Sequence, residues 1–244
     1  MKLWKRQPRL EDDAVRATWQ CVSLLLDYPA DDVEAVRHTV PHLPDPVREP
    51  LETFLAHRDG TPIVELRADY VETFDTRRRG NLFLTYFVHG DTRQRGMALL
   101  RFKDTYEAAG VDLDPGELPD HLCVVLEFAG TVDLESGRAL LLDHRAGFEV
   151  LRLHLRTAGS PWVSLLDAVA ETLPTLAGDE EEAIRRLVAA GPPKEEVGLT
   201  PYGTPSFDAA LMERTSGGPV DLPMPTVPIG SQGSGSTAST WRSA

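Results

Sequence analysis

Apolar residues recur at intervals of three and four along most of this chain of 244 residues, and no segment sustains an alternation of apolar and polar residues. The first spacing is typical of amphipathic helices, whereas alternation is typical of strands. Segment 12–27 shows the helical spacing on one face, with Val15, Trp19, Val22, Leu25 and Leu26. The pattern predicts an all-α fold, which we expect to be a single compact bundle of about nine or ten helices.

The positions of proline and glycine, together with the same spacing, predict the other helices. We expect them over residues 31–40, 46–57, 62–78, 81–88, 92–109, 119–129, 134–157, 161–173 and 180–190. Residues 81–88 are apolar and aromatic on all sides, so their period is ambiguous, and the surrounding pattern favours a helix there as well. Gly60 is expected to end its helix in a left-handed conformation, and Gly110 to end the helix before it.

The composition changes sharply after Pro193, where Pro, Gly, Ser and Thr dominate. Segments of this kind bury too little apolar surface to offset the entropy of ordering the chain. We therefore expect a flexible N-terminus over residues 1–11, an all-helical domain over residues 12–192 and a mostly disordered tail over residues 193–244.

The formal net charge of −13 disfavours nucleic acid as a partner, because phosphate binding depends on clustered Lys and Arg. A basic peptide is the more natural complement, although an acidic surface also serves solubility alone. The longest apolar runs, such as residues 82–88, fall far below the roughly 18 residues that a membrane span requires. We expect a soluble cytoplasmic protein with no stable membrane insertion, in which Cys21 and Cys123 are buried thiols.

The segment from Glu117 to Phe128 combines proline, carboxylates, an imidazole and a strongly apolar face. Pro119 suits the first position of a helix, and Asp120 in the first turn would complement the helix dipole. Leu122, Val125, Leu126 and Ala129 repeat at the spacing of one buried face. Asp120 and Glu127 are seven residues apart, so they should lie above one another on a second, acidic face.

Two groups of residues invite a metal-site or catalytic interpretation. Glu34, His38 and His42 have helical spacing, but Pro41 disfavours a continuous helix there, which indicates surface residues. A helical metal-dependent hydrolase would use His89, Asp91, Asp120 and His121, and this hypothesis stays open as a second function class. No nucleophile motif or phosphate-binding loop is present in the sequence, so we predict no catalytic residues, no resident metal and no cofactor.

The residues Glu117-Leu118-Pro119-Asp120-His121-Leu122, followed by Leu126-Glu127-Phe128, resemble a signature of the cytoplasmic chaperones for molybdenum redox enzymes, E-x-P-D-H-L with L-E-F. These chaperones form the TorD/DmsD-like group. Residues 70–75, 84–86 and 89–96 resemble its NarJ branch, the delta chaperones of respiratory nitrate reductase. The resemblance spans residues 12–190 and is most specific between residues 70 and 128.

This resemblance implies an all-helical, non-catalytic protein that binds the N-terminal leader of the apo nitrate reductase alpha subunit. The chaperone would hold that subunit until its molybdenum cofactor and an iron–sulfur cluster have been inserted. Molybdenum cofactor biosynthesis proteins are further expected partners. A sister chaperone that serves a different molybdoenzyme is the alternative within the same family.

The peptide-binding site is predicted to lie where the region around residues 70–75 meets the segment 117–127. Its expected residues are Tyr70, Phe74, Asp75, Glu117, Pro119, Asp120, His121 and Glu127. We expect apolar side chains to supply most of the affinity and the carboxylates to form a charged rim that sets orientation. Whether His121 touches the peptide or only orders the loop over residues 111–118 stays open at the level of the sequence.

Overall fold

The computed structural model describes residues 10–76, 80–90, 92–114, 116–176 and 178–190. All of them belong to one unit of contacts that extends to residue 196, and the second unit, residues 197–244, lies outside the described residues. The predicted tail over residues 193–244 therefore lies outside the described residues as well. The same holds for the predicted N-terminal segment, apart from Leu10 and Glu11.

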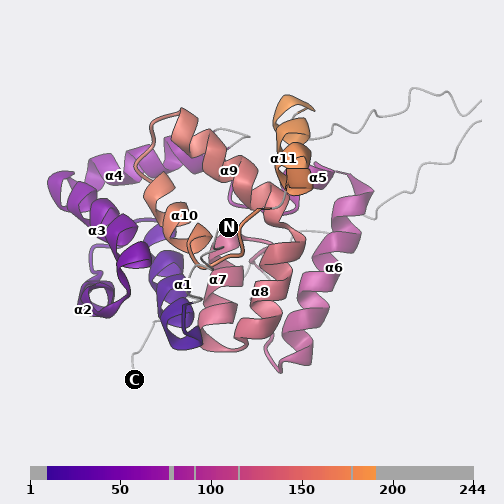
Figure 1. Cartoon of the computed structure of the whole chain (residues 1–244), viewed down its shortest axis with the longest axis horizontal. Helices are drawn as coiled ribbons and strands as arrows, with labels where there is room; N and C mark the ends of the chain where they lie inside the picture. Colours follow the sequence, from indigo (N-terminus) through magenta and orange to yellow (C-terminus); the bar gives the residue numbers. More distant parts are fainter. Residues whose placement is uncertain (1–9, 77–79, 91, 115, 177, 191–244) are drawn as a thin grey trace, which may run out of the picture. The chain divides into compact units, whose positions relative to one another are not determined.

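The described residues form helices joined by short connections, and the prediction of an all-α fold is confirmed (Figure 1). The α-helices are α1 (Asp12–Leu26), α2 (Glu34–Thr39), α3 (Asp45–Gly60), α4 (Ile63–Tyr70), α5 (Tyr86–His89), α6 (Arg93–Ala108), α7 (Leu122–Thr131), α8 (Leu134–Asp143), α9 (Arg145–Thr157), α10 (Val163–Ala170) and α11 (Gly178–Ala190). A 3-10 turn over Val40–His42 follows α2, and a π-helical turn over Val71–Asp75 continues α4. None of these helices is both long and apolar enough to cross a membrane.

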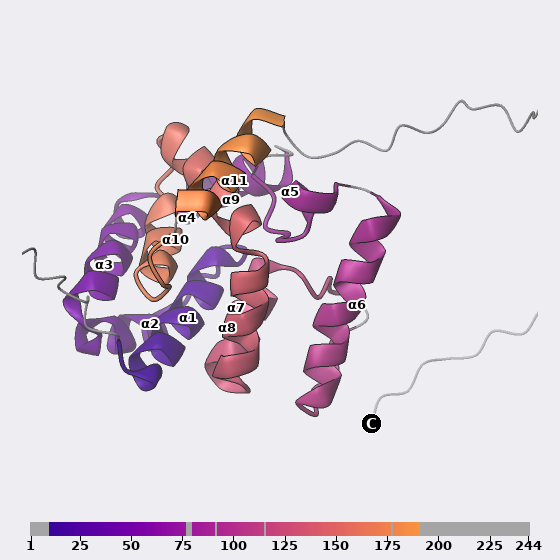
Figure 2. The same cartoon turned by 45° about the vertical axis from the view of Figure 1, so that its right-hand side comes forward.

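Helix α1 packs most extensively against α7, and α10 packs against both α3 and α1. Figures 1 and 2 show α1, α7 and α8 side by side, with α6 alongside α8. Trp19 of α1 is fully buried, and its indole N–H donates to the Thr172 hydroxyl at 2.8 Å. A buried indole needs such an acceptor, because an unpaired N–H in the core would lose its hydrogen bond to water.

An aromatic cluster joins the α4 region to α10. Tyr70 and Phe74 are 7% and 4% exposed, and their rings lie 5.5 and 5.4 Å from the ring of Trp162. The Trp162 N–H donates to the Asp69 carboxylate at 2.7 Å. The predicted helix over residues 62–78 therefore exists as α4 and its π-helical continuation, and its aromatic stripe belongs to the core.

The prediction of a helix over residues 81–88 was wrong for most of its length. Leu82 accepts a hydrogen bond from the Leu122 N–H at 2.8 Å, and the Leu84 N–H donates to the Asp120 carbonyl at 3.0 Å. An isolated antiparallel β-bridge between Phe83 and His121 lies between these two bonds. A short apolar run fits a buried extended segment as well as a buried helix, so its periodicity could not decide between them.

The predicted start of the helix at Pro119 was also wrong, since α7 begins at Leu122 and His121 is its extended N-cap residue. The backbone of residues 120–122 is already paired with residues 82–84, so it cannot join the helix earlier. The predicted helix over residues 134–157 is interrupted at His144, which separates α8 from α9. Gly60 is the last residue of α3, but its φ is not positive, so the expected left-handed conformation was wrong there. Gly110 adopts a φ of +78° after α6, where a helix end was expected.

Candidate functional site

A groove of about 390 Å³ opens between α1 and the start of α7, and we call it the α1–α7 groove. Three stretches of the chain contribute most of its walls: the end of α1, the loop before α7 and the first two turns of α7. The extended residue Phe83 completes them. The lining residues are Ser23, Leu24, Asp27, Phe83, Gly116, Glu117, Leu118, His121, Cys123, Val124 and Glu127.

Apolar side chains of the α1–α7 groove face solvent. Leu24 is 51% exposed and Leu118 is 41% exposed, while Phe83 and Val124 are half-buried. Helix α1 buries Val22, Leu25 and Leu26 against the core, which leaves Leu24 on the opposite side of the helix. Grouped apolar side chains open to water are typical of interaction sites, because covering them removes apolar area from solvent.

Acidic side chains surround this apolar surface. Asp27, Glu117 and Glu127 are exposed, and none of them forms an ion pair with a described residue. Among the described residues that line the groove, none is Lys or Arg. The groove therefore presents negative charge that the described fold does not neutralise, next to apolar area that it does not cover.

The pKa of His121 depends both on its burial and on the carboxylates in and near the groove. Burial lowers the pKa of His121, while the charges of Asp27, Asp120, Glu117 and Asp75 act in the opposite direction, in that order of strength. Its ring packs edge-on against the ring of Phe83, with centroids 5.3 Å apart. The lowered pKa favours a neutral imidazole at pH 7. Burial likewise raises the pKa of the Cys123 thiol, which removes its thiolate character.

The structure brings together some of the predicted peptide-binding residues and separates others. Glu117, His121 and Glu127 line the α1–α7 groove. Asp75 is exposed, and its charge acts on the His121 imidazole, although Asp75 does not line the groove itself. Their role in peptide binding remains a prediction.

Tyr70, Phe74, Pro119 and Asp120 lie outside the lining of the groove. Tyr70 and Phe74 belong to the aromatic core, and the Pro119 carbonyl accepts a hydrogen bond from the Tyr106 hydroxyl at 2.8 Å. Asp120 is fully buried, so the expectation that it lies in the first helical turn on an exposed acidic face was wrong. The reason is the pairing with residues 82–84, which turns the Asp120 side chain inward.

Eight lining residues were not predicted from the sequence: Ser23, Leu24, Asp27, Phe83, Gly116, Leu118, Cys123 and Val124. Leu24 carried a usable signal, since a large apolar residue on the outer face of an amphipathic helix departs from the helical pattern. Asp27 carried none, because an acidic residue after a helix is common on protein surfaces. Phe83 was assigned to the wrong secondary structure, which hid its place beside His121.

The residues of the metal-site hypotheses do not form a group in the described part of the chain. Asp91 lies outside the described residues, and the Asp120 carboxylate accepts hydrogen bonds from the N–H and the hydroxyl of Thr85. The rings of His38 and His42 lie 5.7 Å apart across the 3-10 turn that contains Pro41. Among the described residues, no three His, Cys, Asp or Glu side chains are arranged to hold a metal ion.

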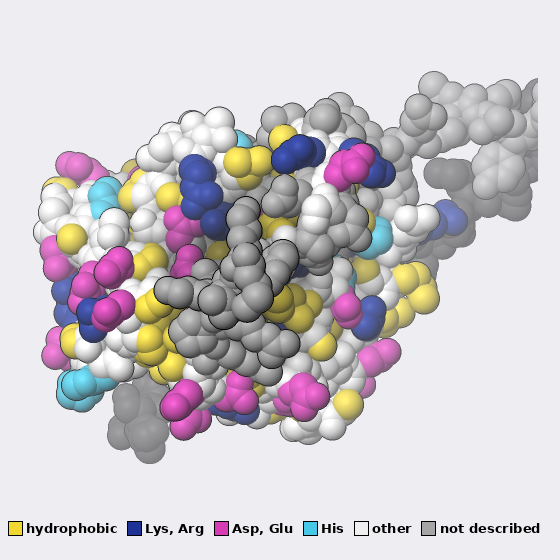
Figure 3. All heavy atoms as spheres, viewed as in Figure 1, with side chains coloured by type: hydrophobic (Ala, Val, Ile, Leu, Met, Phe, Trp, Pro, Cys, Tyr) yellow, Lys and Arg dark blue, Asp and Glu magenta, His cyan; other side chains and the backbone are white. Residues whose placement is uncertain are grey.

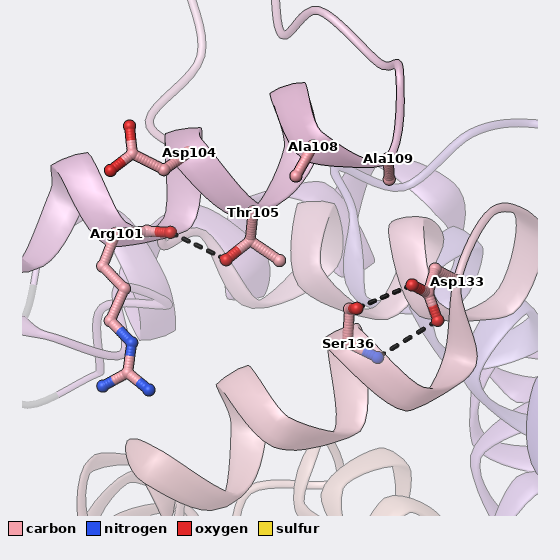
Figure 4. A pocket seen from close by; sticks show the side chains of 7 residues that line it. All are labelled: Arg101, Asp104, Thr105, Ala108, Ala109, Asp133 and Ser136. Carbon is pink, nitrogen blue, oxygen red and sulfur yellow. Dashed lines mark hydrogen bonds between the residues drawn. The ribbon is translucent and has the colours of Figure 1, made fainter.

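A second hollow of about 340 Å³ lies between α6 and the start of α8, and we call it the α6–α8 cavity (Figure 4). Among its described polar side chains, all but the exposed Asp104 bond to one another or to the fold. Asp133 caps α8 by accepting from the Ser136 N–H at 3.1 Å and the Ser136 hydroxyl at 2.6 Å. The Thr105 hydroxyl donates to the Arg101 carbonyl at 2.8 Å, and the Arg101 guanidinium lies 2.5 Å from Asp143.

The surface shown in Figure 3 carries acidic, basic and apolar side chains interspersed, with Asp and Glu gathered along its lower edge. A basic stripe of the kind that binds nucleic acid is not visible among the described side chains on this face. This agrees with the acidic balance of the whole sequence.

Comparison with known proteins identifies a family. Residues 40–168 match the family model described as nitrate reductase delta subunit. The nitrate reductase-like protein NarX of Mycobacterium tuberculosis (strain ATCC 25618 / H37Rv) is 39% identical over 155 residues, which are 63% of this chain and 24% of NarX. The chain thus spans about a quarter of the length of this relative.

Two further relatives are named as assembly chaperones. The probable nitrate reductase molybdenum cofactor assembly chaperone NarJ of Bacillus subtilis is 31% identical and covers 64% of this chain and 88% of that protein. The NarJ of Escherichia coli K12, a nitrate reductase molybdenum cofactor assembly chaperone, is 29% identical over 66% of this chain and 72% of its own. A crystal structure from Archaeoglobus fulgidus, named for redox enzyme maturation, matches with a TM-score of 0.49 and 20% identity over 70% of this chain and 98% of that one.

Proposed function

This chain belongs to the nitrate reductase delta subunit family, and from this premise we propose that it is an assembly chaperone that binds the N-terminal leader of the apo nitrate reductase alpha subunit. The leader occupies the α1–α7 groove. The chaperone holds the alpha subunit until its molybdenum cofactor and an iron–sulfur cluster have been inserted. The NarJ relatives are named as assembly chaperones and not as enzymes, which supports a role without catalytic turnover.

The observation that carries the proposal is the combination of exposed apolar side chains and uncompensated carboxylates in one groove. Leu24 and Leu118 offer apolar area, and Asp27, Glu117 and Glu127 surround it with negative charge. A peptide that pairs apolar residues with Lys or Arg, in a helix or an extended segment, complements both features. A leader of this composition is therefore the ligand that the groove fits.

Magnitudes indicate which contacts matter most. A micromolar complex requires about 8 kcal/mol of net binding free energy. Exposed ion pairs supply about 0.2 to 1 kcal/mol each, whereas burying a large apolar side chain supplies about 1.5 to 3 kcal/mol. We expect the leader's apolar residues on Leu24, Leu118, Phe83 and Val124 to provide most of the affinity. The carboxylates select a basic leader and set its direction.

The predicted residues outside the groove take supporting roles in this proposal. Tyr70 packs edge-on against Tyr28, with ring centroids 5.7 Å apart, and Tyr28 directly follows Asp27 at the end of α1. The ring centroid of Phe74 lies 4.9 Å from that of Tyr70, so Phe74 also packs against this ring. Tyr70 and Phe74 therefore hold the end of α1 in place, and Asp75 adds charge near His121.

Isothermal titration calorimetry with a synthetic leader peptide tests the proposal directly. We expect a dissociation constant in the micromolar range and a weaker complex at higher salt, because the carboxylates attract a basic peptide. A peptide of the same composition in scrambled order is the control, and it should bind more weakly. An absence of binding heat at high micromolar concentrations of the leader would contradict the proposal.

Co-purification from cells that express candidate alpha subunits identifies the client. We expect the apo nitrate reductase alpha subunit to be retained in the cytoplasmic fraction, together with molybdenum cofactor biosynthesis proteins. Retention of a different molybdoenzyme, with no nitrate reductase, would instead identify a sister chaperone.

A further inference from the structure

The buried carboxylate of Asp120 lies directly behind the α1–α7 groove, between two segments that are distant in the chain. It is fully buried, and its Oδ2 accepts hydrogen bonds from the Thr85 N–H at 3.2 Å and from the Thr85 hydroxyl at 2.5 Å. Thr85 is also fully buried. A carboxylate is removed from water at a high cost unless donors replace the lost hydration, so this pair needs an explanation beyond surface charge.

The backbone on both sides of this contact forms a miniature ladder. The Asp120 carbonyl accepts from the Leu84 N–H, and the Leu122 N–H donates to the Leu82 carbonyl, at 3.0 and 2.8 Å. Between these bonds lies the bridge of Phe83 with His121, whose side chains both line the groove. The carboxylate of Asp120 therefore connects the two paired backbone segments. Their central residues, Phe83 and His121, form one wall of the groove.

Arg95 of α6 adds a charge to this arrangement. Its guanidinium Nη2 lies 3.7 Å from the Asp120 carboxylate, and its Nε donates to the Thr85 hydroxyl at 3.2 Å. The same guanidinium lies 5.3 Å from the centroid of the Phe83 ring and 5.8 Å from that of Tyr86. An arginine in contact with an aromatic face and a buried carboxylate restricts both.

Helix α9 fixes the outer side of the extended segment. A Cβ atom at Gly147 would lie 2.3 Å from the Leu84 carbonyl oxygen, so only glycine permits this approach. Leu84 is thus held by the α9 backbone on one side and by the Asp120 carbonyl on the other. Three parts of the fold therefore determine the position of the neighbouring Phe83: helix α6, helix α9 and the residues that precede α7.

We propose that Asp120 is a positioning residue of the α1–α7 groove. Its carboxylate holds residues 82–85 against the start of α7, so that Phe83 and His121 form one preorganised wall for the leader; this inference rests on the proposed function for the ligand. Asp120 itself does not touch the leader, since its side chain is fully buried and does not line the groove. A preorganised wall raises affinity because binding then orders fewer groups.

The test removes the hydroxyl of Thr85 and leaves Asp120 in place. Thr85→Val should weaken leader binding by about fivefold, the factor that corresponds to about 1 kcal/mol for one hydrogen bond. It should also shift the NMR signals of the His121 imidazole and the Phe83 ring in the free protein. Thr85→Ser keeps the hydroxyl and should restore both measurements to the wild-type values.

Thr18→Val is the matched control. Thr18 is as fully buried as Thr85, and its hydroxyl donates to the Ala14 carbonyl within α1 at 2.7 Å. This variant loses the same atom from an equally buried site outside the groove lining, so it should change stability but neither the His121 signals nor the affinity. Asp120→Asn, which keeps an acceptor oxygen and removes the charge beside Arg95, provides the measurement if Thr85→Val does not fold.

The outcomes separate this inference from the proposed function. If the variants lower stability while the His121 and Phe83 signals and the leader affinity stay at wild-type values, the positioning role is overturned. If the wild-type protein binds no leader, the proposed function fails. The NMR signals of the free protein then still decide the positioning role by themselves, and their shift in Thr85→Val but not in Thr18→Val supports it.

Discussion

Two hollows of similar size lie on either side of the α7–α8 pair. They differ in how much apolar area and how many unpaired carboxylates their walls expose to solvent. The α1–α7 groove measures about 390 Å³ and exposes Leu24 and Leu118 next to carboxylates without ion-pair partners among the described residues. The α6–α8 cavity measures about 340 Å³; its described apolar lining is Ala108 and Ala109, and its polar side chains cap helix α8 or bond within the fold, except the exposed Asp104. Volume therefore does not distinguish a binding site from a gap between helices, whereas unused apolar area and charge do.

The largest expected effect on stability and binding comes from Gly147 of α9, which contacts the backbone behind Phe83 of the groove. Gly147→Ala would place a Cβ within 2.3 Å of the Leu84 carbonyl oxygen, and overpacking of this kind costs about 1 to 3 kcal/mol. We expect a lower midpoint in urea denaturation together with weaker leader binding. Gly96→Ala is the control on α6, where a Cβ meets nothing within 4 Å, and it should raise stability by about 0.5 to 1 kcal/mol. Equal behaviour of the two variants would contradict the close approach at Gly147.

The next effect compares two equally exposed leucines. Leu24 of the groove and Leu100 of α6 are each 51% exposed. Leu24→Ser should weaken leader binding about tenfold, since it removes about half or more of the 1.5 to 3 kcal/mol that burial of a leucine provides. Leu100→Ser should leave the affinity unchanged. The free energies of unfolding of the two variants should differ by no more than about 0.5 kcal/mol. Calorimetry measures the affinities, and an equal loss in both variants would mean that the leader does not occupy the α1–α7 groove.

A smaller effect is expected from single carboxylates. Glu127→Gln should weaken leader binding by no more than about fivefold, because an exposed ion pair contributes about 0.2 to 1 kcal/mol. It should also make the affinity less dependent on salt concentration. Asp104→Asn in the α6–α8 cavity removes the same charge from the other hollow and should change neither quantity. A loss for Asp104→Asn equal to that for Glu127→Gln would show that only the net charge matters.

The smallest effect compares two histidines, the half-buried His121 and the buried His144, as the pH falls. Burial lowers the pKa of His121 and of His144, so the folded state binds a proton less readily than the unfolded state does. Their contribution to stability is therefore complete above the unfolded pKa of about 6.5 and is lost as the pH falls below that value. Four carboxylates oppose the shift at His121, whereas at His144 the hydrogen bond to the Leu140 carbonyl and the charge of Asp143 oppose it and the charges of Arg101 and His89 reinforce it.

Urea denaturation at a series of pH values measures this difference. His121→Gln and His144→Gln should each remove part of the loss of stability below about pH 6.5, because each variant lacks a group that the unfolded state protonates more readily than the folded state does. The comparison uses the slope of stability against pH, so a uniform destabilisation of either variant does not affect it. A steeper slope in either variant than in the wild type would contradict the direction of the shifts.

The sequence predicted the helices well where their stability is local. The amphipathic pattern over residues 12–27 corresponds to α1, and the expected end at Gly110 coincides with a left-handed residue after α6. The prediction failed where a distant segment decides the backbone. The Asp120 carboxylate bonds to Thr85, 35 residues away, and this pairing delays the start of α7 to Leu122. No pattern within residues 117–128 contains that information.

Part of the candidate site could likewise be predicted. Glu117, His121 and Glu127 were expected from the motif and do line the α1–α7 groove. Leu24 and Asp27 were missed because they come from α1, which packs beside α7 only in the tertiary structure. Tyr70 and Phe74 were expected at the site because residues 70–75 resemble the NarJ branch and aromatic side chains suit a peptide groove, but they pack against the indole of Trp162, the N-cap residue of α10, in the core.

The sequence by itself determined the all-α class and the kinship with the delta subunit family, since both depend on spacings and motifs that are local in the chain. The tertiary structure alone decided which carboxylates face solvent and which are buried. Asp120 and Glu127 read alike as acidic residues seven positions apart, yet one is fully buried and the other lines the groove. The physical reason is that burial of a charge depends on its surroundings: the hydrogen-bond donors to Asp120 belong to Thr85, and the Arg95 guanidinium lies 3.7 Å from its carboxylate.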